Sequence, residues 1–145
     1  MTMKVAAAAI LLLLLAACGG SSGSGSADKV PEVVSGSAWI GVTVTNGTRS
    51  ADVPADARRN LTPLLATRLL DRPAPLSEYG LDHPQAALVY KASSGATVDV
   101  DLGQPNFDRH FLYAQRRGRP GVYLVAADTL RPVLALVGID IKPPE

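Results

Sequence analysis

The sequence predicts an α+β domain in which an antiparallel sheet of about five strands carries two helices. Short runs of alternating hydrophobic and polar residues predict the strands, and two segments with hydrophobic residues at helical spacing predict the helices. One helix is expected after the first strand and the other near the C-terminus. The predicted strands lie within residues 37–45, 87–92, 97–102, 111–114 and 122–126.

The first predicted strand ends at a tight turn. Ile40, Val42 and Val44 alternate along one side of this strand, and Asn46-Gly47 is a turn signal. Trp39 falls on the opposite side, where we interpret it as a core or lid residue at the start of a strand.

A helix is expected over residues 52–70. Pro54 and Pro63 each suit a first helical turn, so the sequence predicts either a kinked helix or a short turn that runs into a second helix. The prolines within residues 71–75 end this segment. Its hydrophobic residues at helical spacing are Leu61, Leu64, Leu65 and Leu69.

A compact corner at residues 79–84 precedes the remaining strands. Residues 97–102 are expected to have one wet face, because Asp99 and Asp101 alternate there with hydrophobic residues. Gly103 is expected to close this strand.

The last two strands form a predicted hairpin through a basic turn at residues 116–121. Asp128 is then expected to cap the final helix, and Gly138 is expected to end it. The residues expected to point inward from this helix are Leu130, Val133, Leu134 and Val137.

The N-terminal segment has the features of an export signal. Lys4 precedes an apolar run over residues 5–15 that is too short to span a bilayer but has the proportions of a signal-peptide core. Leu15-Ala16-Ala17-Cys18 resembles the bacterial lipobox, in which a signal peptidase cuts before the cysteine and the thiol carries a diacylglycerol. We therefore expect residues 1–17 to be a signal peptide and Cys18 to be lipidated.

Residues 18–30 are expected to form a flexible tether, because glycine and serine cannot bury enough apolar surface to become ordered. Several acyl chains would make the anchoring permanent. Gly19 stands where lipoproteins of an inner membrane typically carry Asp. The lipobox resemblance therefore implies the periplasmic face of the outer membrane if the host has two membranes. Residues 31–145 are expected to form one domain.

Composition narrows the possible partners and cofactors. The chain has 14 basic and 13 acidic residues, and Lys4 leaves with the signal peptide, so the mature charge is balanced. This balance gives no reason to expect nucleic acid as a partner. Cys18 is the only cysteine. Once its thiol carries lipid, the chain has no cysteine left for disulfides, metal binding or catalysis. The covalent lipid is the only prosthetic group we expect.

A family resemblance appears in a series of short motifs. They are Trp39, Tyr79-Gly80-Leu81-Asp82 with Pro84, Leu102-Gly103, Leu112-Tyr113 and Val122-Tyr123-Leu124-Val125. Their order is similar to that of the bacterial domain of unknown function family 4340 (DUF4340). The resemblance covers residues 39–137 and implies an exported or membrane-anchored protein, with some members encoded beside ABC-transporter components of the gliding-motility type. It implies no catalytic residues and a structural role for the motif at residues 79–84.

Three arginines are the candidate binding residues. Arg116, Arg117 and Arg119 share one turn, and guanidinium groups form bidentate contacts with phosphate and carboxylate. An anionic envelope component or an acidic protein is the partner that such a turn fits. The alternative is a solvated turn that keeps a sheet edge from pairing, with Asp99 and Asp101 balancing the arginines across the sheet.

The two histidines raise the alternative of catalysis or ligand binding. His83 lies beside Asp82 with Ser77 nearby, but neighbours in sequence do not make a catalytic triad. Asp108 and His110 together with His83 could supply three metal ligands, although a solvated loop is the favoured interpretation. We therefore expect a non-catalytic lipoprotein that binds another envelope component, with a hydrolase or small-ligand-binding protein using the Asp82-His83 corner as the alternative.

Overall fold

The computed structural model describes residues 29–36 and 38–145. The predicted signal peptide, Cys18 and most of the predicted tether lie outside these described residues. None of the described helices is long and apolar enough to cross a membrane.

Seven strands form one antiparallel sheet in the order β3-β2-β6-β7-β8-β9-β5, and two further strands form a separate antiparallel pair. The large sheet contains β2 (Trp39–Thr45), β3 (Ser50–Asp52), β5 (Arg68–Leu70), β6 (Ala86–Ala92), β7 (Thr97–Pro105), β8 (Phe111–Arg116) and β9 (Val122–Ala126). The pair contains β1 (Glu32–Val34) and β4 (Leu64–Leu65). The helices are α1 (Ala55–Arg58), the short 3-10 helix η1 (Leu76–Tyr79) and α2 (Ala127–Ala135).

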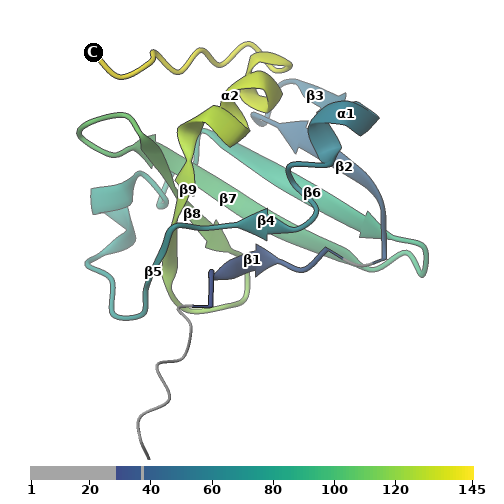
Figure 1. The fold of residues 1–145 in the computed structure, drawn as a ribbon, viewed down its shortest axis with the longest axis horizontal. Coiled ribbons are helices and arrows are strands. Elements are labelled where there is room, and N and C mark those ends of the chain that lie inside the picture. Colours follow the sequence, from purple (N-terminus) through teal and green to yellow (C-terminus); the bar gives the residue numbers. More distant parts are fainter. Residues whose placement is uncertain (1–28, 37) are drawn as a thin grey trace, which may run out of the picture.

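The strand pair covers one face of the large sheet (Figure 1). The chain passes from β4 into β5 through Ala66 and Thr67, so one bent segment belongs to both sheets. The Ala66 N–H donates to the carbonyl of Pro31 beside β1, whereas the Thr67 N–H donates to the carbonyl of Leu124 in β9, each at 2.8 Å. We call the face of the large sheet toward β1 and β4 the inner face, and the opposite face the outer face.

The core lies between the inner face, the strand pair and α2. Tyr90 is its largest fully buried side chain, and its hydroxyl donates to the carbonyl of Leu61 at 2.8 Å. Burial raises the pKa of Tyr90, so the hydroxyl remains a donor. Other buried members of this core are Val33, Val34, Val42, Val44, Leu64, Leu88, Val100, Leu102, Leu112, Val125, Leu130, Val133 and Leu134.

The class of fold is as predicted, but the sheet has seven strands rather than about five. The five predicted strands are β2, β6, β7, β8 and β9, which are the contiguous middle of the sheet. The two missed strands, β3 and β5, have three residues each and lie at its edges. Runs this short are below the length at which alternation can be recognised.

The helix predicted over residues 52–70, directly after the first strand, is wrong. The chain forms only α1 there, followed by β4 and β5, and three strands precede α1. Thr62-Pro63 prevents a helix continuous with α1, since proline provides no N–H for a helix interior and disfavours helical backbone in the residue before it. The residues after Pro63 pair as strands instead, β4 with β1 and β5 with β9. Leu64 is fully buried while Leu65 is 45% exposed, which is strand-like alternation.

The prediction that Trp39 points away from the core side of β2 is wrong. β2 carries one more residue than β6 between the pairs Trp39–Ala92 and Gly41–Lys91. Such a bulge reverses the alternation. Trp39 therefore lies on the inner face, with its ring 5.5 Å from that of Tyr90, and Ile40 is 58% exposed. Its interpretation as a core residue agrees with this packing.

The C-terminal helix has the predicted inward face, because Leu130, Val133 and Leu134 are fully buried. The predicted cap is wrong: Ala126 occupies the N-cap position, and Asp128 lies in the first turn. There Asp128 bonds to Arg131, one helical turn later, instead of to the backbone. Gly138 follows the helix with φ of +80°, as expected of a glycine that ends a helix.

Candidate functional site

The basic turn joins β8 to β9, as the sequence predicts. The Arg119 N–H donates to the carbonyl of Arg116 at 3.1 Å, and Gly118 has φ of +83°, a conformation that glycine adopts without strain. A hollow of about 410 Å³ lies beside the turn. Its lining residues are Thr97, Val98, Asp99, Arg116, Arg117, Gly118 and Arg119.

Arg117 is already paired within the protein. Its Nη1 lies 2.5 Å from Asp99 Oδ2, and its Nη2 and Nε lie 2.5 Å and 3.3 Å from the two carboxylate oxygens of Asp101. Hydrogen bonding to Asp101 raises the pKa of Arg117 and keeps it charged. The sequence predicts that Asp99 and Asp101 balance the charges of the turn. These bonds show that charge balance for Arg117, one of the three arginines.

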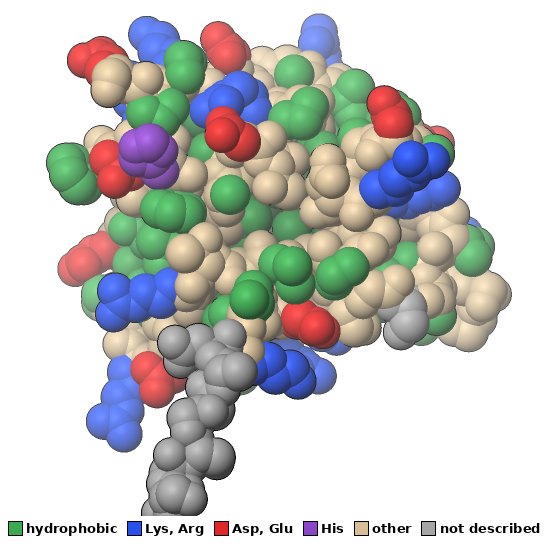
Figure 2. Space-filling view, in the orientation of Figure 1, with side chains coloured by type: hydrophobic (Ala, Val, Ile, Leu, Met, Phe, Trp, Pro, Cys, Tyr) green, Lys and Arg blue, Asp and Glu red, His purple; other side chains and the backbone are tan. Residues whose placement is uncertain are grey.

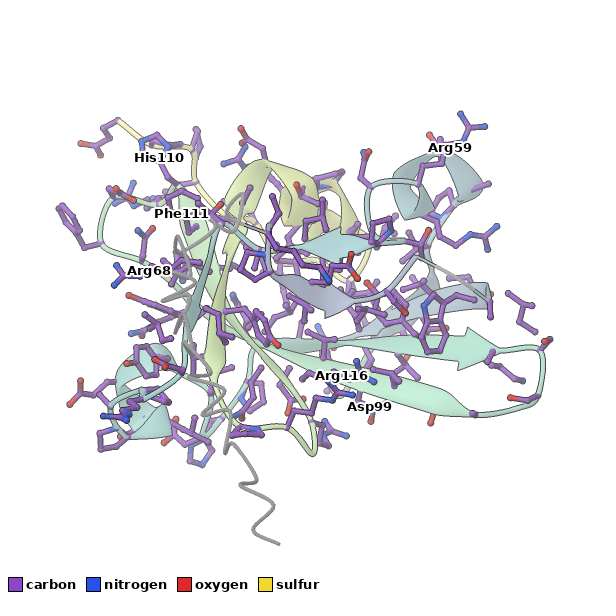
Figure 3. The ribbon with its side chains drawn as sticks, turned by 60° about the horizontal axis from the view of Figure 1, so that its bottom comes forward. Arg59, Arg68, Asp99, His110, Phe111 and Arg116 are labelled. Carbon is purple, nitrogen blue, oxygen red and sulfur yellow. The ribbon has the colours of Figure 1, made fainter. Side chains whose placement is uncertain are left out.

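Arg116 and Arg117 belong to opposite faces of the sheet. Arg116 is paired in register with Val100, and paired residues share a face, so Arg116 extends from the inner side at the end of β8. Figure 3 shows Arg116 close to Asp99, which lies near the start of β7. Arg119 is exposed at the tip of the turn. All three arginines line the hollow beside the turn, and Arg116 and Arg119 are the two that form none of the ion pairs found among the described residues.

The Asp82-His83 corner contains a contact between the two neighbouring side chains. His83 Nδ1 lies 3.1 Å from Asp82 Oδ2, and the His83 side chain is 93% exposed. The hydrogen bond from His83 lowers the pKa of Asp82. Ser77 contributes its backbone carbonyl, which accepts a bond from Gly80. No hydrogen bond of the described residues joins the Ser77 hydroxyl to His83.

His110 lies in a different part of the molecule. It lines a hollow of about 210 Å³ together with Phe107, Asp108, Arg109 and the C-terminal residues Pro144 and Glu145, and His83 does not line it. Asp108 accepts a bond from the backbone N–H of His110 at 3.0 Å. Figure 3 shows His110 at the upper left, well separated in the view from Arg116. In residues 29–36 and 38–145, no three His, Cys, Asp or Glu side chains are grouped as metal ligands.

The family model for the domain of unknown function DUF4340 matches residues 52–135. The chain belongs to this family. The match begins at the last residue of β3 and ends at the last residue of α2, so it excludes all of β2, including Trp39. No curated protein and no solved structure matches the chain.

The DUF4340 motif at residues 79–84 packs on the outer face of the sheet. The Tyr79 ring lies 4.7 Å from that of Tyr113, and the Tyr79 hydroxyl accepts a bond from the N–H of Ala74 at 2.9 Å. Gly80 has φ of +68°, and Leu81 is only 5% exposed. Among the described residues, the Asp82 side chain bonds only to its neighbour His83, and Pro84 is exposed.

Gly103 is the position where this corner meets β7. A Cβ at Gly103 would lie 2.2 Å from the carbonyl oxygen of Tyr79, which is shorter than any allowed contact. Gly103 does not close the strand as predicted, because β7 continues to Pro105. Its role in the DUF4340 domain is instead to let the corner approach the sheet, with an irregular register between Leu102 and Pro105.

Sequence reasoning assigned no function to Leu65 and Thr129. Both line two neighbouring hollows between β4 and α2. Leu65 was placed on the buried side of a helix that does not form. The only signal in the sequence is Pro63, which favours extended backbone at the preceding residue, Thr62.

Proposed function

We propose that the chain is a lipid-anchored bacterial envelope protein that acts by binding another envelope component and not by catalysis. The lipobox Leu15-Ala16-Ala17-Cys18 carries this proposal, because it ends an apolar signal-like run and precedes a Gly/Ser tract. The lipid on Cys18 holds the domain at a membrane, on the periplasmic face of the outer membrane where the host has two. Membership of DUF4340 is compatible with this role.

The proposed contact is the turn between β8 and β9. Arg117 stays with Asp99 and Asp101, while Arg116 and Arg119 offer guanidinium groups to carboxylate or phosphate. The partner is therefore anionic, either an acidic protein surface or an anionic headgroup. The family resemblance makes an ABC-transporter subunit the first protein to test.

Acylation is tested by labelling with a fatty-acid analogue during export in a bacterial host. The natural chain is expected to be shortened and to carry the label, whereas Cys18→Ser should accumulate as unlabelled precursor. Cys18→Ser that is cut and located like the natural chain would contradict the anchoring proposal.

Binding is tested by crosslinking the acylated protein in its native envelope and identifying partners by mass spectrometry. The double variant Arg116→Glu and Arg119→Glu should lose the specific partner. Arg72→Glu is a matched control, because it reverses an exposed charge that lies outside the hollow beside the turn. Retention of the partner by the double variant would exclude the turn as the contact.

A vesicle-binding assay run beside the crosslinking distinguishes an acidic protein from an anionic headgroup as the partner. A protein partner is recovered as a crosslinked polypeptide, whereas a headgroup partner is recovered only as binding to anionic vesicles that falls with salt. His83→Ala should leave either kind of binding intact. Loss of function in His83→Ala with an intact arginine double variant would favour the hydrolase or ligand-binding alternative at the Asp82-His83 corner.

A further inference from the structure

We propose that the groove between β4 and α2 binds an extended peptide segment with apolar side chains and acidic ends. The groove consists of two hollows, of about 450 Å³ and about 300 Å³, that share Leu65 and Thr129. It involves none of the arginines of the β8–β9 turn, so this proposal is independent of the contact proposed above.

The groove exists because β4 and α2 diverge from each other. β9 pairs with β5 as far as Leu124, and the chain then turns into α2 at Ala127. The bent segment that contains β4 runs past this point toward β1. Leu65 on β4 and Thr129 on α2 therefore lie on opposite sides of a space that no strand fills.

β4 presents an open backbone edge to this groove. The Ala66 N–H donates to Pro31, so the adjacent pair Glu32–Leu65 is of the non-hydrogen-bonded kind. The N–H and C=O of Leu65 therefore point away from β1, and β1 is the only strand that pairs with β4 among the described residues. An extended peptide can bond to such an edge as an added strand.

Apolar side chains line both hollows. Val30 is 53% exposed and Leu65 is 45% exposed, and both belong to the larger hollow. Pro31, Ala66 and Ala126 complete the apolar part of that hollow, and Pro63 lies in the smaller one. Figure 2 shows this face, in which mostly uncharged atoms cover the area over β1 and β4, with an acidic side chain among them and other charged side chains around the area. An apolar centre inside a charged rim is the usual anatomy of a binding surface.

The charged residues of the lining indicate which charges the bound peptide carries at its ends. Lys29 lines the larger hollow and Arg59 lines the smaller one, and they are the only charged residues that line either hollow. Glu32 and Asp128 lie near the groove but not in its lining, and Asp128 is paired with Arg131. A peptide with acidic residues on both sides of an apolar stretch is complementary to this arrangement. The concave shape of the groove favours a peptide as the occupant. A bilayer is disfavoured because it contacts side chains that protrude from a surface.

The test uses the mature chain with Cys18→Ser, which carries no lipid, and a phage-displayed library of random short peptides as the probe. Enriched peptides should show apolar residues at alternate positions with Asp or Glu on both sides. In synthetic versions, N-methylation of the peptide amide that faces Leu65 should abolish binding, because it removes the donor needed for strand addition. Amide chemical shifts should move at Leu65, Ala66 and Thr67.

Thr129→Trp is the blocking variant, because residue 129 lines both hollows, and it should weaken peptide binding at least about tenfold. Thr129→Ser is its matched control and should bind normally. The pair Lys29→Glu and Arg59→Glu should weaken binding of acidic peptides and reduce its salt dependence, whereas Arg72→Glu should not. Circular dichroism and a thermal melt check that each variant is folded.

Several results would overturn the proposal. They are the absence of enriched peptides, equal binding of enriched peptides to Thr129→Trp, and unchanged binding after N-methylation. The proposal is also overturned if the chain associates with itself or binds phosphatidylglycerol vesicles, and Thr129→Trp abolishes that interaction and not peptide binding. None of these results bears on acylation of Cys18 or on the arginine turn, which are tested with other variants.

Discussion

The corner at residues 76–84 and the turn at residues 116–121 both border the outer face of the large sheet, but they are held by different forces. The corner is held by close packing, with the Tyr79 carbonyl placed directly over Gly103 and Leu81 buried. The turn is held by charge, through the bonds of Arg117 to two aspartates of β7. Packing at short range tolerates no added atom, whereas exposed ion pairs tolerate many changes.

This difference separates the residues that maintain the fold from those available for binding. The motif by which the chain resembles DUF4340 lies in the packed corner. The candidate binding residues Arg116 and Arg119 lie in the turn, where side chains can change without disturbing the core. Variants in the corner are therefore expected to change stability, and variants in the turn to change binding.

Gly103→Ala should have the largest effect on stability. Its Cβ would lie 2.2 Å from the Tyr79 carbonyl, so the corner must move off the sheet, at a cost of about 3 kcal/mol. Urea unfolding monitored by circular dichroism measures this loss. Gly41→Ala is the control, because nothing lies within 4 Å of its added Cβ, and it should be neutral or stabilising by about 0.5 kcal/mol. Equal stability of the two variants would show that the corner is loosely held.

Tyr79→Phe should have a smaller effect in the same corner. The substitution keeps the ring against Tyr113 but removes the acceptor for the Ala74 N–H. A part-buried N–H without a partner costs about 1 kcal/mol, measured again by urea unfolding. Tyr113→Phe keeps the same ring pair and should cost less, because no hydrogen bond of its hydroxyl is found among the described residues. A larger loss in Tyr113→Phe would mean that the hydroxyl of Tyr79 does not hold the corner.

The sequence was sufficient to predict the strands in which hydrophobic and polar residues alternate over five residues or more. The middle strands of the sheet and the inward face of α2 follow directly from spacing, because every second or every third to fourth residue is buried in the core. It was insufficient at residues 52–70, where four leucines match helical spacing but the chain after Pro63 pairs with β1 and β9 instead. The bulge at Trp39 was also unpredictable, since it depends on pairing with β6.

The candidate site was predicted in part. The turn, its three arginines and the balancing role of Asp99 and Asp101 follow from the sequence, because the hairpin fixes their neighbourhood. The division of Arg116 and Arg117 between opposite faces follows from alternation along β8. Which residues of β7 lie beside them depends on the register of the two strands, which spacing does not define. The groove between β4 and α2 arises from elements distant in sequence, so no local pattern indicates it.

The smallest effect is expected in the turn itself. Arg117→Ala leaves Asp99 and Asp101 on one face without their shared cation, and should cost about 1 kcal/mol at low ionic strength. Because the side chain of Arg117 is 58% exposed, roughly 1 M sodium chloride should remove most of this difference by screening. Urea is the suitable denaturant, since it adds no salt. Arg119→Ala is the matched control and should change stability by less than about 0.5 kcal/mol at either ionic strength.

A loss in Arg117→Ala that persists in salt would mean that the arginine acts through the packing of its aliphatic stem and not through charge. The turn would then resemble the corner, and its arginines would be less free to bind a partner. A salt-sensitive loss confined to Arg117 keeps the two regions distinct. Arg116 and Arg119 then remain the cations that can change partner affinity without changing the stability of the fold.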